Sequence, residues 1–184
     1  MKSRLYKQYI STVLPELKKR LKASNVHSVP RLEKVVLNVG IGKLVREGDV
    51  LEKVRNNLAK ISGQRPVVRN AKKSISGFKL RQGTPVGLMV TLRGDRMYYF
   101  VDKLINIVFP RIRDFRGIDP KSVDARGSLS IGIQDHVIFP EIGTEDMEPP
   151  HGLQITLHTT AQNREAGKEL FILLGVPFGE SSAS

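Results

Sequence analysis

The sequence predicts an α+β fold, a two-layer sandwich in which helices pack on one face of a five-stranded, mostly antiparallel sheet. Three observations predict it. Helical and strand patterns follow one another in the order α-β-α-β-β-α-β-β-α. Two of the strand patterns are joined by a stretch typical of a long hairpin tip. The 40% of hydrophobic residues in 184 are enough for one core, so we expect a single domain over residues 1–184.

Apolar residues recur at helical spacing in four segments. These are residues 5–21, 51–61, 97–108 and about 163–174. Pro15 should kink or restart the first helix, and Pro110 should stop the third. Asp95 is a plausible N-cap for the third helix, and Gly63 stands where a left-handed cap would end the second.

Five segments that are rich in valine or alternate in polarity predict the strands. They are residues 32–42, 66–71, 86–94, 128–134 and 152–160. The stretch 69–83 joins the second and third strands, so we expect it to protrude as a basic hairpin tip. The end of the chain, residues 179–184, should fray.

The charge of the chain is unevenly distributed. It has 30 Lys and Arg against 18 Asp and Glu, a formal net charge of +12, yet residues 135–184 hold only two basic and eight acidic side chains. No acid occurs between Glu52 and Asp95. Such an excess favours a polyanionic partner, which could be nucleic acid or an anionic membrane surface. The densest charge lies on the predicted hairpin rather than on an amphipathic helix, which disfavours the membrane.

The segment "RNAKKSISGFKLRQG" (69–83) is the strongest candidate for nucleic-acid contact. It contains five basic residues and no carboxylate: Arg69, Lys72, Lys73, Lys79 and Arg81. A solvated, flexible loop is the alternative. Phe78 could stack on a base or anchor the loop to the core. "PRIRDFRG" (110–117) is a second candidate, because an extended chain would present Arg111, Arg113 and Arg116 at nearly alternate positions. Its alternative is a set of ordinary surface arginines around a buried Phe115.

No combination of side chains predicts catalysis, a metal or a cofactor. There is no cysteine, and Gly40-x-Gly42 lacks the third glycine of a dinucleotide-binding turn, since position 45 is Val45. The cluster Glu145, Asp146, Glu148 and His151 could bind a divalent cation or be a solvated acidic loop. An RNA-processing enzyme stays an alternative that would need paired buried carboxylates or histidines beside the basic tip. The spaced apolar residues of the N-terminus argue against a signal peptide, so we expect an intracellular protein.

Four ordered blocks carry a resemblance to a known family. "RLEKVVLNVGIG", "AKKSISGFKLRQGTPVGLMVTLRGDRM", "PRIRDFRG" and "IFPEI" resemble the large-subunit ribosomal protein L-five family, the one that binds 5S ribosomal RNA. The match runs from about Arg4 to Phe178. The chain departs from the family pattern at residues 123–129, where an aromatic, a glycine and an amide are replaced, and the contacts of that loop are therefore in doubt. The absence of a leading extension is typical of a bacterial, cytoplasmic member.

The resemblance implies a structural, non-enzymatic protein of the ribosomal central protuberance, without cofactor, metal or membrane. It implies that the chain attaches 5S rRNA to large-subunit rRNA, beside other 5S-rRNA-associated large-subunit proteins. It also implies a bridge to a small-subunit head protein and contact of the hairpin tip with peptidyl-site tRNA. Carried onto this chain, the 5S rRNA surface would comprise Asn38, Gly40, Gly42, Thr91, Arg93 and Gly94. The tRNA-contacting loop would comprise Lys72, Lys73, Ser74, Ser76, Phe78, Lys79, Arg81 and Gln82. Arg111, Arg113 and Arg116 would serve ribosomal RNA or the bridge.

Overall fold

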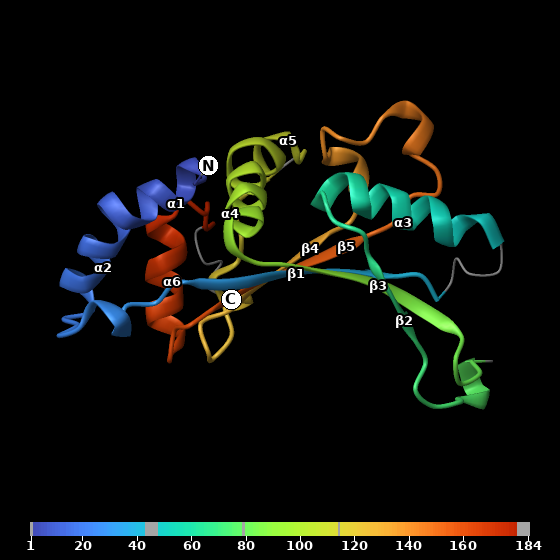
Figure 1. Cartoon of the computed structure of the whole chain (residues 1–184), viewed down its shortest axis with the longest axis horizontal. Helices are drawn as coiled ribbons and strands as arrows, with labels where there is room; N and C mark the ends of the chain where they lie inside the picture. The colour runs from blue at the N-terminus through green and yellow to red at the C-terminus, as the bar shows by residue number, and fades with distance from the viewer. Residues whose placement is uncertain (1, 43–47, 79, 114, 180–184) are drawn as a thin grey trace. The chain divides into compact units, whose positions relative to one another are not determined.

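The computed structural model describes residues 2–42, 48–78, 80–113 and 115–179 (Figure 1). Its five strands form one open antiparallel sheet in the order β2-β3-β1-β5-β4, with helices on it, so the predicted α+β class is confirmed. The strands are β1 (Leu32–Gly40), β2 (Val67–Asn70), β3 (Pro85–Leu92), β4 (Leu129–Ile133) and β5 (Leu153–Thr159). The α-helices are α1 (Arg4–Gln8), α2 (Leu14–Arg20), α3 (Gly48–Ser62), α4 (Gly94–Lys103), α5 (Phe109–Arg111) and α6 (Arg164–Leu173).

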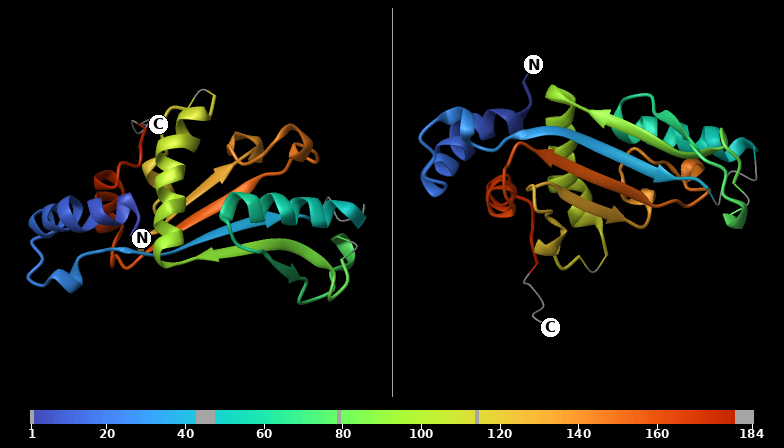
Figure 2. Two further views of the ribbon diagram at one scale, coloured as in Figure 1. Left: turned by 45° about the horizontal axis from the view of Figure 1, so that its top comes forward. Right: turned by 90° about the horizontal axis from the view of Figure 1, so that it is seen from below.

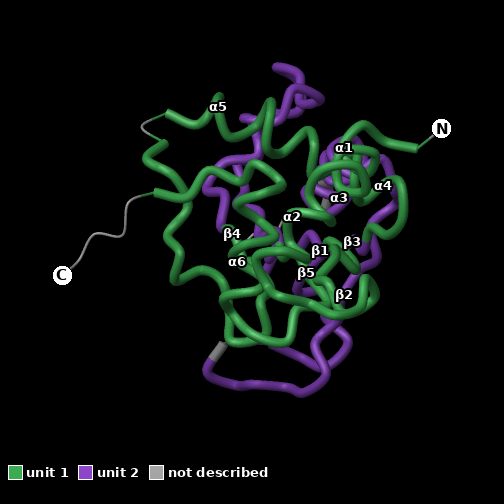
Figure 3. The backbone as a smooth tube through the Cα atoms, turned by 90° about the vertical axis from the view of Figure 1, so that its left-hand side faces the viewer, with its two compact units in different colours: residues 1–35, 92–131, 156–184 green, residues 36–91, 132–155 purple. Residues whose placement is uncertain are grey.

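The chain divides into two compact units (Figure 3). Unit 1 comprises residues 1–35, 92–131 and 156–184, and unit 2 comprises residues 36–91 and 132–155. Strands β1, β3, β4 and β5 contribute residues to both units, whereas β2 belongs to unit 2. That the whole chain is a single domain stays a prediction.

Two helical segments of unit 1 contain a π turn that ends two residues before a proline. The π turns are Tyr9–Val13, which joins α1 to α2, and Leu104–Val108, which joins α4 to α5. Each turn places its proline in the first turn of the next α segment, where the missing N–H of proline is not needed. The restart expected at Pro15 is therefore found. The stop expected at Pro110 is wrong, because the helix continues to Arg111.

The start of α4 also differs from the expectation. Its N-cap is Arg93 rather than Asp95, and Gly94 opens the helix with a φ of 58°. Asp95 lies in the first turn, where a carboxylate complements the helix dipole. The last helix agrees better, since the side chain of Asn163 caps α6 by accepting a hydrogen bond from the backbone N–H of Ala166 at 2.8 Å.

In unit 2, helix α3 covers one face of the strands, as Figure 1 shows. Its Val54, Leu58 and Ile61 are buried, and Gly63 ends it with a φ of 66°, as predicted. Leu37 and Val39 of β1 are fully buried. Successive strand residues point to opposite faces, so the residues between them belong to the other face. That face is not covered by α3 and is turned to the viewer in the right-hand panel of Figure 2.

Candidate nucleic-acid interface

The uncovered sheet face of unit 2 presents Asn38 and Gly40 from β1. Both are exposed, between the buried Leu37, Val39 and Ile41. The Asn38 side chain makes no hydrogen bond to any described residue, so its amide is available to an external partner. Asn38 lies beside β3, because its Oδ1 is 4.0 Å from where a Cβ on Gly87 would stand.

Gly40 on this face, and Gly42 in the turn after β1, have no role among the described residues that requires glycine. A Cβ added to Gly40 or Gly42 would meet no atom within 4 Å, and neither residue has a positive φ. Glycine inside a strand costs about 0.5–1 kcal/mol relative to alanine. The physical reason that remains is close approach of another molecule to the backbone. Gly132 of β4 has the same properties in the same unit and was missed, although the alternation of "SLSIGIQ" already placed it among the exposed positions.

The other three residues predicted for this surface are divided between the units. Thr91 ends the unit 2 part of β3, and its carbonyl accepts a hydrogen bond from Gln64 Nε2 at 3.3 Å. Arg93 and Gly94 belong to unit 1. The exposed Arg93 guanidinium lies 3.7 Å from Glu33, so its charge is partly answered, although such surface pairs contribute little. Gly94 has a local reason to be glycine, namely its positive φ.

The basic segment between β2 and β3 is held by its own backbone. Strands β2 and β3 pair antiparallel, and beyond them Ile75 and Leu80 exchange N–H···O hydrogen bonds of 2.9 and 3.1 Å. Ser74 Oγ accepts a hydrogen bond from the backbone N–H of Gln82 at 2.9 Å, so this serine side chain serves the segment itself. The exposed hydroxyl of Ser76 stays available.

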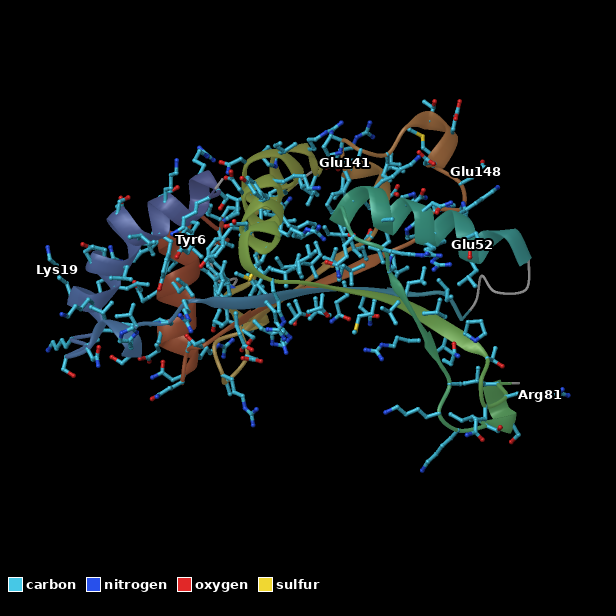
Figure 4. The ribbon with its side chains drawn as sticks, viewed as in Figure 1. Tyr6, Lys19, Glu52, Arg81, Glu141 and Glu148 are labelled. Carbon is cyan, nitrogen blue, oxygen red and sulfur yellow. The ribbon has the colours of Figure 1, made fainter. Side chains whose placement is uncertain are left out.

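Four cations of residues 69–83 are exposed: Arg69, Lys72, Lys73 and Arg81. None of the four forms an ion pair with any residue in the described part of the chain. Figure 4 shows Arg81 projecting away from the hairpin. Lys79 and the side chain of Phe78 lie outside what the structure describes, so the alternatives for Phe78 stay open.

The arginine segment of unit 1 is built differently from the expectation. Arg111 is in helix α5 and Arg113 in a turn, so they do not alternate along an extended chain. Both are exposed, as is Arg116. Phe115 is half-buried and stacks on the buried Phe109, with ring centroids 5.3 Å apart and planes at 7°. Phe115 therefore anchors the segment, while the three arginines stay exposed.

The acidic loop does not gather into a cation site. Asp146 pairs with Lys60 of α3, with 2.6 Å between Oδ2 and Nζ, and this hydrogen bond lowers the pKa of the Asp146 carboxyl. His151 is buried. Within the described ranges, no three His, Cys, Asp or Glu side chains are placed to hold a metal ion. No described helix is long and apolar enough to cross a membrane.

Comparison with known proteins gives one consistent result. Residues 25–81 match the family model described as ribosomal protein L5, and residues 85–178 match the model of the ribosomal L5P family C-terminus. The chain is 50% identical to the large ribosomal subunit protein uL5 of Thermus aquaticus over 174 residues, which are 95% of this chain and 96% of that protein. It is 49% identical to the uL5 protein of Desulfatibacillum aliphaticivorans over 176 residues, with 96% and 98% covered. The uL5 protein of Acaryochloris marina is 47% identical over 181 residues, with 98% and 100% covered.

Proposed function

Because the chain belongs to the ribosomal protein L5 family, a family of structural, non-enzymatic constituents of the large ribosomal subunit, we propose that it binds 5S rRNA and helps attach it in the central protuberance. As a component of the bacterial ribosome it resides in the cytoplasm. Its other partners in this proposal are large-subunit rRNA and neighbouring 5S-rRNA-associated proteins.

The observation that carries the proposal is the uncovered face of unit 2. The Asn38 amide there pairs with no described residue, and Gly40, with Gly42 in the turn after β1, leaves open space that nothing in the described chain uses. RNA is recognised through close backbone approach, 2′-hydroxyls and exposed bases, and small residues with a short polar group suit that mode. The proposed surface also includes Thr91, while Arg93 and Gly94 of unit 1 supply a further phosphate contact.

The basic hairpin segment serves a second RNA in this proposal. Lys72, Lys73 and Arg81 form no ion pair with any described residue, and we assign them to peptidyl-site tRNA. The cluster Arg111, Arg113 and Arg116 is assigned to ribosomal RNA or to the bridge with a small-subunit head protein. Arginine suits such sites because its planar guanidinium binds phosphate or carboxylate through two hydrogen bonds.

The first experiment is a titration of the purified chain with its cognate 5S rRNA at several salt concentrations. Peptidyl tRNA analogues and an unrelated RNA hairpin serve as competitors. We expect tight 5S rRNA binding that survives both competitors. Equal binding to all three RNAs, with the same steep salt dependence, would show that only nonspecific phosphate attraction operates and would refute the proposal.

The division of labour between the two surfaces is tested with the triple variant Lys72→Ala, Lys73→Ala, Arg81→Ala. Affinity falls with salt, and each phosphate contact contributes about −0.7 to the slope of log affinity against log salt on single-stranded RNA. The loss of three contacts should therefore make this slope shallower by about 2. The loss should affect tRNA contact on the ribosome and leave 5S rRNA binding intact. The matched control removes three lysines of the N-terminal helices, Lys7, Lys18 and Lys19. If the hairpin variant loses 5S rRNA binding while its circular dichroism is unchanged, the two surfaces are wrongly assigned.

A further inference from the structure

Two histidines are stacked in the interior of unit 2. His136 is fully buried and His151 is 5% exposed, and their ring centroids are 3.8 Å apart with planes at 18°. They lie at the two ends of the segment 136–151, which contains the acidic loop. Neither belongs to the proposed RNA surfaces.

The hydrogen bonds of His136 define which of its nitrogens carries the proton. Its Nε2 lies 3.0 Å from the carbonyl oxygen of Asp146, which can only accept, so Nε2–H is the donor. The buried Asn57 of α3 donates its Nδ2 to the same carbonyl at 2.9 Å. His136 Nδ1 is left as an acceptor and faces the backbone N–H of His151 at 3.5 Å. The ring therefore fits its surroundings in the neutral form.

His151 is also neutral in this arrangement. Its Nδ1 lies 3.1 Å from the carbonyl oxygen of Pro149, so this nitrogen carries the proton. Its Nε2 is buried and has no hydrogen-bond partner among the described residues. A proton added at Nε2 would create a buried, charged donor with no acceptor, directly against the other imidazole.

We propose that His151, stacked on the buried His136, is a pH-sensitive latch: while its ring is neutral it holds residues 136–151 on helix α3, and protonation of His151 releases them. The latch controls how an acidic surface is presented. The exposed Glu145 and Glu148 lie on this segment, together with the exposed Met147. Figure 4 shows Glu148 beyond α3, on the side of unit 2 away from the basic hairpin.

The charged groups around the pair, Asp135 and Asp146, do not account for the pH dependence. Asp135 Oδ1 lies 3.5 Å from His136 Nδ1 and favours a protonated ring, but its side chain is 55% exposed and water screens it. Asp146 is tied to Lys60, and the hydrogen bond from Lys60 keeps the pKa of this carboxyl below its usual range. The Asp146 carboxylate therefore keeps its charge in the pH range where histidine titrates, and its pair with Lys60 adds no pH dependence there.

The pH range follows from the environment of His151. Burial lowers the pKa of His151 below its ordinary value of 6.5, and the neighbouring His136 lowers it further. The released segment then binds a proton more readily than the latched one. The stabilisation is fully present above pH 6.5 and is lost as the pH falls through the lowered pKa. One proton can raise the opening constant up to about tenfold per pH unit in this range.

The test is hydrogen–deuterium exchange of the full chain at pH 7.5, 6.5 and 5.5, with rates corrected for intrinsic exchange. Amides of residues 137–150 should lose protection by up to about tenfold per unit below pH 6.5. The double variant H136Q/H151Q should show no such pH dependence. The matched control H27Q/H158Q, which replaces the two histidines of unit 1, should behave as the parent. Constant protection in the parent, or the same change in both variants, would overturn the proposal.

A second measurement does not depend on any variant folding. The ring protons of His151, followed by NMR on the parent chain, should titrate below pH 6.5, together with shifts of the amides in residues 137–150. A ring that titrates at or above its ordinary pKa, or without effect on those amides, would also overturn the latch.

Discussion

Gly40→Ala separates the folding role of the open sheet face from its binding role. A Cβ at this position has no atom within 4 Å and the backbone has no positive φ, so the chain itself should accept it without strain. Alanine restricts the unfolded chain more than glycine does. We therefore expect the free energy of unfolding to rise by about 0.4–1 kcal/mol.

The same methyl group should weaken 5S rRNA binding. It would stand between the β1 backbone and any RNA that approaches it, and a displaced hydrogen bond to a charged phosphate is worth about 1.5–3 kcal/mol. At 1.4 kcal/mol per factor of ten, the dissociation constant should rise by about 10- to 100-fold. Stability is measured by urea unfolding and affinity by filter binding at fixed salt.

Gly143→Ala is the matched control for Gly40→Ala. Gly143 is exposed on the acidic loop, has a φ of −84°, and a Cβ there would come no closer than 3.9 Å to another residue. This control should bind 5S rRNA as the parent does. A Gly40→Ala chain that is at least as stable as the parent and binds 5S rRNA equally well would refute the placement of the RNA on this face.

Three further predictions concern the interior of each unit. Gly167→Ala should lower the free energy of unfolding, measured in urea, by about 1–3 kcal/mol, because its Cβ would lie 2.4 Å from the Cα of Gly127. Unchanged stability would mean that the Gly127 backbone moves aside without cost. Asn57→Ala should cost about 1 kcal/mol and speed amide exchange in residues 137–150, since it removes the donor to the Asp146 carbonyl; unaltered exchange there would contradict the role given to Asn57. Burial raises the pKa of Tyr98 to about 12, so its stabilisation is complete below pH 10 and is lost as the pH rises through about 12. The free energy of unfolding should therefore fall less between pH 9 and 11.5 in Tyr98→Phe than in the parent chain. An equal fall in both chains would contradict this role of Tyr98.

The fold could largely be predicted because its signals are local. The valine-rich stretch 32–42 predicted strand β1, and Gly63 and Asn163 marked helix ends through their own backbone and side-chain chemistry, whereas Asn38 was assigned to the RNA surface through the family resemblance. Pro110 misled because the rule for proline assumes an uninterrupted α-helix. A π turn before it changes which residue needs a hydrogen-bond donor, and no residue pattern around Leu104–Val108 announces that turn.

Some features of the candidate site could likewise be predicted from the sequence, and others could not. The cations of the hairpin were evident, because an acid-free run shows in the sequence itself. The proposed histidine latch was not evident in the sequence. Its residues Asn57, His136 and His151 are far apart along the chain and come together only through the folding of unit 2. The role of the segment 110–117 was left open between RNA contact and ordinary surface arginines around a buried Phe115, and the stacking of Phe115 on Phe109 is a contact that the sequence does not show.

The opposite charges of unit 2 give it an electric dipole. Its hairpin carries cations that pair with no anion among the described residues, and its acidic loop carries Glu148 on the far side of α3 (Figure 4). In the field of a polyanion such a unit experiences a torque as well as an attraction, so it turns its hairpin toward the nucleic acid before contact. The acidic loop then faces away from the phosphates, and its carboxylates oppose any encounter in the reversed orientation. The order of charges along unit 2 would thus favour one orientation of this unit on a polyanion over the reverse.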